Sequence, residues 1–345
     1  MSTRLSYPLL ASLLSSAALL VGCGDSSDPN PIATTDTGAG VDSGGADVAV
    51  DAPIGPCGVP AKRVVTLEAT ATESDVAKAF ASAATGDSIV FGKGTFKFTN
   101  TLTLVVTGVA VCGQGMDDTT LDFSGQLAGS EGIYGDKSSD LLLAKLTVKD
   151  TLGNGVKVIG ADRVTFRAVK VLWTGAEPTK HGAYGLYPVQ CKQVLIEDSV
   201  AMGASDAGLY IGQSDQIVVR RNRAEQNVAG IEIENSFNAD VYDNTSTDNT
   251  AGILVFDLPD LPQLGGHNVR IYKNSIKANN RKNFAPAGNI VGKVPAGTGF
   301  FVMANKDVEV FENTFENNDT VNSAVVSFLV IRIPIKDAKY YPYPA

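Results

Sequence analysis

The chain has 345 residues, of which 35 are glycine, 7% are aromatic and 19% are charged. This composition excludes a helical bundle or a coiled coil, which would be rich in Glu, Lys and Leu. The formal net charge is −9, and residues 23–56 carry six aspartates and no basic residue. The rest of the chain is nearly balanced and has no basic block, which excludes a nucleic-acid partner.

The first 22 residues have the pattern of an export signal. Arg4 precedes an apolar stretch at residues 9–21, which is too short to cross a bilayer as a helix but has the length of a secretion-signal core. The run Leu20-Val21-Gly22-Cys23 resembles a bacterial lipobox, in which cleavage precedes a cysteine that takes a lipid. The alternative is an ordinary signal peptide with an incidental cysteine. We expect a lipoprotein signal peptide over 1–22, lipidation of Cys23 and anchoring in the bacterial cell envelope, at the outer membrane or the cell surface.

Residues 23–56 contain almost nothing large to bury, so we expect a disordered acidic tether followed by a folded domain over 57–345. Cysteines can pair in an exported protein. Cys57 and Cys112 both lie near the N-terminal end of the folded part and are the candidates for a disulfide, which leaves Cys191 as a small buried thiol. No pair of cysteines has CxxC spacing, so neither a zinc site nor a redox site is predicted.

A repeat of 22 residues dominates the second half of the chain. Gly208, Gly230 and Gly252 each begin a Gly-apolar-x-apolar segment, and asparagine pairs recur at 222/227, 244/249, 274/279 and 313/318. Three short strands per repeat cannot bury a face alone, but stacked coils share one core, and adjacent coils lie ~4.8 Å apart. We expect the asparagine columns to be structural, because Asn tolerates left-handed backbone at sharp corners and stacked amides bond to one another.

Upstream of the repeats, Ser74 to Ala84 has the pattern of a short amphipathic helix with Ser74 or Asp75 as its cap. Residues 86–104 and 108–123 alternate as strands. A helix at this place is expected to cover the exposed edge of the first coil, as the end of a solenoid requires.

This arrangement resembles the right-handed parallel β-helix proteins of the pectate-lyase-like group, and among them the exported bacterial family of parallel β-helix repeat-containing proteins, which are often lipoproteins. The segments that carry the likeness are HGAYGLYPVQ (181–190), SDAGLYIGQS (205–214), VAGIEIENS (228–236) and GILVFDLPDLP (252–262). The resemblance implies an all-β, single-stranded, right-handed parallel β-helix with a short N-terminal capping helix, and it implies no established activity. It also leads us to expect either that the apolar run Ala324–Ile335 caps the C-terminal edge or that the chain is truncated there.

Alternation within each repeated strand separates surface from core, because the residue after Gly points inward and the next points outward. This predicts one outward column of Lys157, Tyr187, Tyr210, Glu232, Leu254 and Phe301, and a second of Ile159, Val189, Gly212, Glu234, Phe256 and Met303. Rigid rings stack on pyranose faces and carboxylates accept hydroxyl protons. We therefore expect an extended polysaccharide to bind along Lys157, Tyr187, Tyr210, Glu232, Glu234 and Phe256. The alternative is an ordinary solvated sheet face whose apolar end is covered by the insertions 258–267 or 279–298.

A polysaccharide lyase needs a base for the proton α to a carboxylate, a group that neutralises that carboxylate, and an acid for the leaving oxygen. The candidates for catalytic roles are His181, Tyr187, Asp206 and Tyr210. For His181 the alternative is a loop residue that is hydrogen-bonded to the backbone. No cofactor is required and no metal site is predicted, although carboxylates such as Asp206 could bind Ca²⁺ between protein and uronate.

Glu232 and Glu234 are spaced for a pair of glycosidase carboxylates, but any solvated strand face shows the same spacing. The ordered Asp motifs of polygalacturonase-like hydrolases, the DPHD motif of alginate epimerases and the DH-containing strand of pectate lyases are missing. The prediction is an envelope-anchored β-helix that engages an extended polysaccharide, with uronic-acid chains as candidates, as a lyase or epimerase. The alternative is a non-catalytic glycan-binding or scaffold protein.

Overall fold

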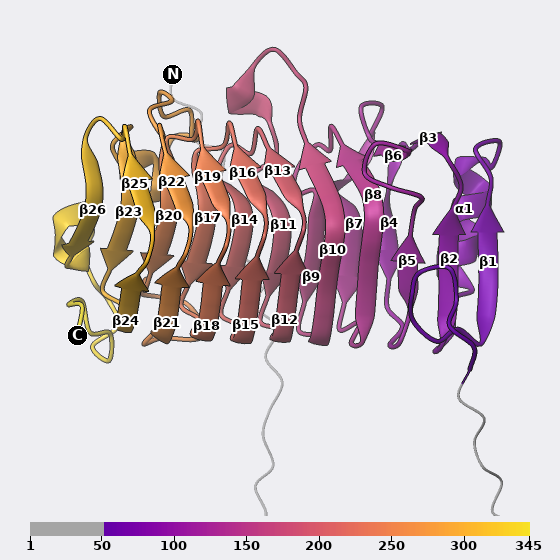
Figure 1. Ribbon diagram of the computed structural model, residues 1–345, viewed down its shortest axis with the longest axis horizontal. Coiled ribbons are helices and arrows are strands. Elements are labelled where there is room, and N and C mark those ends of the chain that lie inside the picture. The colour runs from indigo at the N-terminus through magenta and orange to yellow at the C-terminus, as the bar shows by residue number, and fades with distance from the viewer. Residues whose placement is uncertain (1–51) are drawn as a thin grey trace, which may run out of the picture. The chain divides into compact units, whose positions relative to one another are not determined.

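The computed structural model describes residues 52–345, so the expected signal peptide, Cys23 and nearly all of the tether lie outside the described residues. The described chain is a stack of coils whose strands run side by side from β1 at one end to β26 at the other (Figure 1). No helix between residues 52 and 345 is long and apolar enough to cross a membrane.

All the strands between residues 52 and 345 belong to two parallel sheets. The nine-stranded sheet contains β4 (Asn100–Leu104), β7 (Ala128–Asp136), β9 (Val156–Ile159), β11 (Tyr184–Val189), β14 (Ala207–Gly212), β17 (Ala229–Glu234), β20 (Ala251–Phe256), β23 (Thr298–Met303) and β26 (Val321–Val326). Neighbours in this sheet come from successive coils, as a solenoid requires.

The second sheet has seventeen strands and forms the rest of each coil. Its strands are β1 (Arg63–Leu67), β2 (Asp87–Phe91), β3 (Gly94–Lys97), β5 (Ala110–Cys112), β6 (Thr119–Asp122), β8 (Leu141–Lys149), β10 (Asp162–Leu172), β12 (Lys192–Glu197), β13 (Val200–Met202), β15 (Asp215–Arg220), β16 (Arg223–Glu225), β18 (Phe237–Tyr242), β19 (Thr245–Thr247), β21 (His267–Tyr272), β22 (Ser275–Lys277), β24 (Lys306–Phe311) and β25 (Thr314–Glu316). Three 3₁₀ turns complete the described elements, at Pro178–Lys180 (η1), Val291–Lys293 (η2) and Phe328–Ile331 (η3).

The predicted repeat is one coil of the solenoid. Ile231 lies beside Leu209 on one side and Ile253 on the other, so residues 22 apart in the sequence are neighbours across the sheet. All three side chains are fully buried in one continuous core that runs from Leu67 to Val302. Because each coil buries its apolar face only against the next coil, the repeat itself specifies the register.

The asparagine columns form two hydrogen-bonded ladders. Asn244 donates to the side chain of Asn274 at 3.0 Å and accepts from the backbone and side chain of Asn222 at 2.9 and 3.0 Å. The same pattern links 227, 249, 279 and 318. The expectation that these asparagines take the left-handed backbone is wrong. The left-handed residue is the one before each of them, such as Asp243 with φ 54°. The exposed residue before each asparagine adopts the left-handed backbone at the corner. The buried Asn side chain can therefore form hydrogen bonds with the equivalent asparagines of the neighbouring coils.

The N-terminal end of the core is covered as expected. The helix α1 (Glu73–Ala81) buries Val76 and Phe80 against the first coils. Its N-cap is Thr72 rather than Ser74 or Asp75, because Thr72 and Asp75 form a reciprocal capping box. The disulfide between Cys57 and Cys112 is confirmed, and Cys191 is a buried free thiol.

The C-terminal run Ala324–Ile335 does not cover the end of the core. Phe328 and Ile331 of η3 pack instead, together with Tyr340, on the outer face of the nine-stranded sheet. Val325, which belongs to the last described coil, is 62% exposed. The run is apolar because it covers the side of the solenoid, a role that its composition alone does not distinguish from an end cap.

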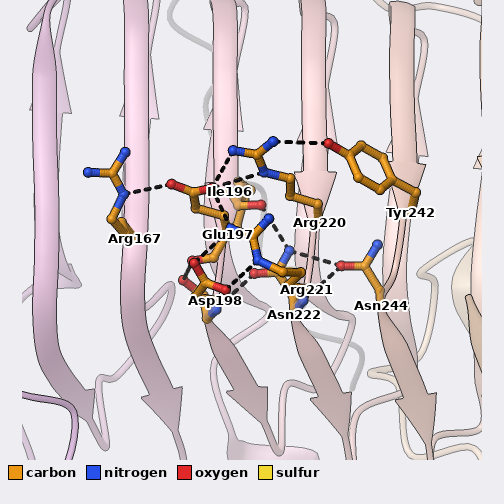
Figure 2. A network of polar contacts seen from close by, with 10 residues as sticks. Arg167, Ile196, Glu197, Asp198, Arg220, Arg221, Asn222, Tyr242 and Asn244 are labelled. Carbon is orange, nitrogen blue, oxygen red and sulfur yellow. Dashed lines mark hydrogen bonds and ion pairs between the residues drawn. The ribbon is translucent and has the colours of Figure 1, made fainter.

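A charge network lies on the outer face of the seventeen-stranded sheet (Figure 2). Glu197 is buried and accepts hydrogen bonds from Arg167 at 2.6 Å, Arg220 at 2.7 Å and Arg221 at 2.8 Å. Burial alone would raise the pKa of Glu197, but the three guanidinium groups outweigh it and lower the pKa to about 2. The carboxylate of one coil therefore bonds to arginines of the coils on both sides of it.

We expect Glu197→Gln to lower the free energy of unfolding by about 2 kcal/mol at pH 7, because it leaves partly desolvated guanidinium groups without their anion. Since the pKa of Glu197 is lowered in the folded state, its contribution is present above the ordinary carboxyl pKa and is lost as the pH falls toward 2. Urea denaturation measures the loss. Asp198→Asn is the matched control, because Asp198 is exposed and pairs with Arg221 alone; an equal loss in both variants would contradict the expectation.

Candidate functional site

The predicted outward columns exist in the nine-stranded sheet. Tyr187 lies beside Lys157, Tyr210 beside Glu232 and Gly212 beside Glu234, and the columns continue to Phe301 and Met303. Tyr134 precedes Lys157 in the same column and was not identified from the sequence. The alternation of inward and outward side chains within each short strand therefore predicted correctly that these residues share one face of one sheet.

Only half of this face is open to solvent. Tyr134, Lys157 and Tyr187 are half-buried, and we call them the open stripe. The other positions expected in a solvated groove are buried: Tyr210 is 4% exposed, Glu232 3%, Glu234 8% and Phe256 1%. For these four residues the expectation of an open polysaccharide-binding surface is wrong.

Three segments cover the second half of the face. They are residues 257–266, residues 278–297 and the C-terminal residues from 327 onward, which pack Leu258, Val291, Val294, Phe328 and Tyr340 against the outward residues of β14, β17, β20 and β23. The outward residues in these coils become apolar after Glu234, with Leu254, Phe256, Phe301 and Met303. If this face were exposed, a large apolar patch would be in contact with water. Packing of the three segments on it is therefore favourable.

Three carboxyl groups lie under this cover. Asp206, Glu232 and Glu234 come from two adjacent coils and line a cavity of about 210 Å³ together with Tyr184 and Asn289. Glu232 Oε2 is buried and, within the described residues, has no hydrogen-bond partner. No ion pair with a cation is formed by these carboxyls within the described residues, so burial favours the neutral form of each.

The pKa values of the three acids reflect this environment. Burial, followed by the charge of Glu234, raises the pKa of Asp206 to about 7, against hydrogen bonds from Asn289 and Tyr184. Burial also raises the pKa of Glu234 to about 7, although its hydrogen bonds with Tyr210 and Glu232 oppose the shift. Burial and the two neighbouring acids raise the pKa of Glu232 well above its usual range. Protonatable acids of this kind are common where proton transfer or recognition of an anion takes place.

Tyr184 and Tyr210 pack between the acids and Tyr187 of the open stripe. Tyr210 donates to Glu234 Oε1 at 2.5 Å, and its ring lies 4.4 Å from that of Tyr184 and 4.9 Å from that of Tyr187. Burial raises the pKa of Tyr187 to about 12 and the pKa of Tyr210 well above its usual value. A tyrosine base must lose its proton readily, so the covered state does not prepare either phenol for that role.

His181 lies outside this group. Its Nδ1 is 2.7 Å from the carbonyl oxygen of Gly203 and its Nε2 is 2.9 Å from that of Gly175, and its ring stacks beside Trp173. It does not line the cavity of the three acids. The structure thus shows the alternative weighed for this residue, a loop histidine bonded to the backbone, and it does not bring His181 to Tyr187, Tyr210 or Asp206.

Besides Tyr134, sequence reasoning missed two residues at the acid cluster. Tyr184 occurs in the quoted run HGAYGLYPVQ, but strict alternation places a residue three positions before Tyr187 on the opposite face, so the pattern did not indicate it. Asn289 donates to Asp206 Oδ2 at 2.8 Å from the 278–297 segment, across 83 positions of sequence. Nothing in the repeat indicates such a contact, because the segment is an insertion into it.

No cluster of three or more metal-binding side chains arranged around a common point occurs among residues 52–345. The expectation that Ca²⁺ takes part stays a prediction.

Comparison with known families matches the chain to the right-handed β-helix region family over residues 112–260 and 179–328, which overlap and together span more than half of the sequence. The chain belongs to the right-handed β-helix family. This confirms the predicted all-β fold and its handedness, and it agrees with the resemblance to pectate-lyase-like proteins. No curated protein matches the sequence.

Solved structures with the same fold are distant in sequence. An alginate lyase from Paenibacillus sp. str. FPU-7 superposes with a TM-score of 0.52 at 17% identity, covering 74% of this β-helix chain and 95% of the lyase. The A-module of a mannuronan C-5 epimerase from Azotobacter vinelandii gives a TM-score of 0.48 at 17% identity, covering 75% and 78% of the two chains. A pectate lyase gives 0.43 at 14% identity, covering 82% and 83%.

Proposed function

We propose that this β-helix binds an extended acidic polysaccharide along the open stripe, which ends beside the cluster of buried acids. The observation that carries the proposal is the position of Tyr187. It is half-buried, with the Lys157 ammonium 5.2 Å from its ring centroid on one side and Tyr210, bonded to Glu234, on the other.

The chemistry of the open stripe suits a uronate chain. Lys157 supplies a cation for a sugar carboxylate, and the phenols of Tyr134 and Tyr187 supply hydroxyl groups that can donate to or accept from sugar hydroxyls. The three positions lie on successive strands β7, β9 and β11, ~4.8 Å apart, so a chain running along the solenoid axis meets one of them per coil. The fold is shared with an alginate lyase, which supports an acidic polysaccharide as the ligand class.

Turnover is the second candidate, and the acid cluster favours it. A neutral carboxyl group can donate a hydrogen bond to the substrate carboxylate and so stabilise the charge that develops on it during proton abstraction. However, Asp206 is 6% and Glu232 3% exposed, and Asn289 of the 278–297 segment bonds to Asp206, so a polysaccharide reaches these two acids only when the segment moves. β-Elimination or epimerisation therefore requires an open form of this segment, whereas binding along the stripe does not.

We expect Lys157→Ala and Tyr187→Ala each to weaken binding of alginate or pectate oligosaccharides about tenfold, which corresponds to about 1.4 kcal/mol. Isothermal titration calorimetry on residues 57–345, with calcium and with chelator, measures the affinity. Lys192→Ala is the control, because Lys192 is an exposed lysine on the other sheet. If the unmodified protein binds no acidic polysaccharide, or if the control weakens binding as much as Lys157→Ala, the proposal fails.

Absorbance of the unsaturated uronate, followed in the same mixtures, separates the candidates. An increase that Tyr210→Phe abolishes establishes elimination at the acid cluster. Binding without absorbance, and without a change in the sugar composition of the polymer, establishes a non-catalytic module.

We further propose that the protein acts at the bacterial cell envelope, held by a lipid on Cys23 and a tether over residues 23–56. The lipobox-like run at residues 20–23 supports this proposal. Mass spectrometry of the processed N-terminus tests it, because lipidation predicts a modified Cys23 as the first residue.

A further inference from the structure

A long groove crosses the outer face of the seventeen-stranded sheet, away from the nine-stranded sheet and its acid cluster. It consists of two hollows of about 690 and 660 Å³ that share Asn238 and Asp240. Together they extend over five consecutive strands, β12, β15, β18, β21 and β24, which stand side by side in Figure 1. The groove therefore runs along the solenoid axis, perpendicular to the strands.

The groove arises from a repeated bend in the backbone. The second residue of each of these five strands has a left-handed conformation, with φ between 48° and 60°; they are Gln193, Gln216, Asn238, Asn268 and Asp307. A single left-handed residue bends a strand, and the same bend at the same position of every coil aligns into a continuous hollow. The side chains at the bend form one wall of the hollow, and those two positions later form the other: Leu195, Val218, Asp240, Arg270 and Glu309.

The charges at the centre of the groove are compensated by neighbours. Arg270 donates to both carboxylate oxygens of Asp240, at 2.6 and 2.7 Å. Arg220 donates to the Glu197 carboxylate and to the Tyr242 hydroxyl. Figure 2 shows this second arrangement, in which the guanidinium of Arg220 lies between the Glu197 carboxylate and the Tyr242 ring. An anionic polymer would have to displace these pairs, so the groove does not suit nucleic acid or a uronate chain.

Apart from the exposed carboxylates Asp307 and Glu309 at the β24 end, what remains available is neutral hydrogen-bonding and apolar surface. Gln193 and Gln216 are exposed on one wall, opposite the half-buried aliphatic side chains of Leu195 and Val218. Adjacent strands are ~4.8 Å apart, which is close to the length of one pyranose unit in an extended chain. Each sugar can place its C–H face on the aliphatic wall and its hydroxyls on the amides. An extended peptide finds no unpaired backbone here, because β15 is hydrogen-bonded to β12 on one side and β18 on the other.

We propose that this groove is a second carbohydrate site, which binds an uncharged, extended polysaccharide independently of the open stripe. A β-helix with two such faces would bridge an acidic and a neutral glycan.

The test is affinity electrophoresis of residues 57–345 in native gels that contain glucan, xylan, mannan or galactomannan, with alginate as the acidic comparison. We expect at least one neutral polysaccharide to retard the protein. Val218→Arg, which fills the groove with a charged side chain, should weaken this retardation at least tenfold, and Gln216→Gly should weaken it severalfold. The glycine fits the left-handed backbone at position 216, so Gln216→Gly removes the side chain without adding strain.

Gln226→Gly is the matched control, because Gln226 is also left-handed, with φ 62°, but does not line the groove. Tyr187→Ala should leave binding of the neutral chain unchanged, which separates this proposal from the one for the open stripe. The proposal is overturned if none of the neutral polysaccharides retards the protein, or if Val218→Arg and Gln216→Gly bind as the unmodified chain does. Equal weakening by Gln226→Gly would also overturn it.

Discussion

Asn244→Ala is expected to lower the free energy of unfolding by about 4 kcal/mol, because the substitution leaves several buried polar groups without a hydrogen-bond partner. The Asn244 amide nitrogen donates to the carbonyl oxygen of Val219 at 2.9 Å and to Asn274 at 3.0 Å. Its oxygen accepts from the backbone and side chain of Asn222. Alanine removes all four bonds, and Asn244 is 1% exposed, so the groups that lose their partner are shielded from solvent.

The loss of unfolding free energy should be smaller for an asparagine at the end of the ladder than for one in its middle. Asn313 belongs to the last described coil, is half-buried, and its amide donates to the carbonyl of Ile271 at 2.7 Å with no further asparagine beyond it. We therefore expect Asn313→Ala to cost about half as much as Asn244→Ala. Asp243→Gly is the control, because Asp243 has the left-handed backbone at the corner but is exposed and forms none of the ladder bonds. This variant should change the free energy of unfolding by less than about 1 kcal/mol.

Denaturation in guanidinium chloride gives these free energies where unfolding is two-state, and amide hydrogen exchange gives them coil by coil where it is not. A loss below about 1 kcal/mol for Asn244→Ala would show that the ladder is only a consequence of stacking. A loss that is the same at Asn244 and Asn313 would show that the solenoid unfolds without regard to position in the stack.

The second large effect is a fall in stability between about pH 4 and pH 7. The pKa values of Asp206 and Glu234 are raised to about 7, from ordinary values near 4, and the pKa of Glu232 is also raised well above its usual range. A carboxyl whose pKa is raised by folding stabilises the folded state fully below its unfolded pKa. That stabilisation is lost as the pH rises through its folded pKa. Each shift of about three pH units corresponds to about 4 kcal/mol as an upper bound, and the coupling of the acids keeps the total near that of one.

Ionisation should act first on the cover of the site. Asp206 holds Asn289 of the 278–297 segment, and three carboxylates in one small cavity repel one another. We expect hydrogen exchange in residues 278–297 to accelerate about tenfold from pH 6 to pH 8, after correction for the intrinsic pH dependence of exchange. If polysaccharide turnover is found, its rate should rise over the same range.

Glu232→Gln isolates this effect. The amide keeps the shape of the side chain but does not ionise, so the variant should lose less stability than the unmodified protein between pH 5 and pH 8. Glu309→Gln is the control, because Glu309 is an exposed carboxyl on the other sheet. Thermal unfolding across this range measures both variants. A pH profile for Glu232→Gln that coincides with that of the unmodified chain would contradict the assignment of the fall to the acid cluster.

Much of the fold follows from local pattern. The 22-residue spacing of Gly208, Gly230 and Gly252 specifies both the coil and the pairing between coils, because stacked strands can bury their apolar residues only in register. The capping helix and the Cys57–Cys112 disulfide also followed from the order of residues near the N-terminal end. The outward columns of the candidate site were readable for the same reason, since each side chain repeats its position in the next coil.

What the sequence by itself determined is therefore the solenoid, its register and which side chains share a face. Only the tertiary structure decided which part of that face meets solvent. The segments that bury Glu232 and Glu234 lie outside the repeat, and Asn289 reaches Asp206 from 83 positions away. A periodic pattern fixes the contacts between equivalent residues, because these are local to neighbouring coils. An insertion that folds back over several coils has no such period, and its contacts depend on the packing of the whole side of the solenoid.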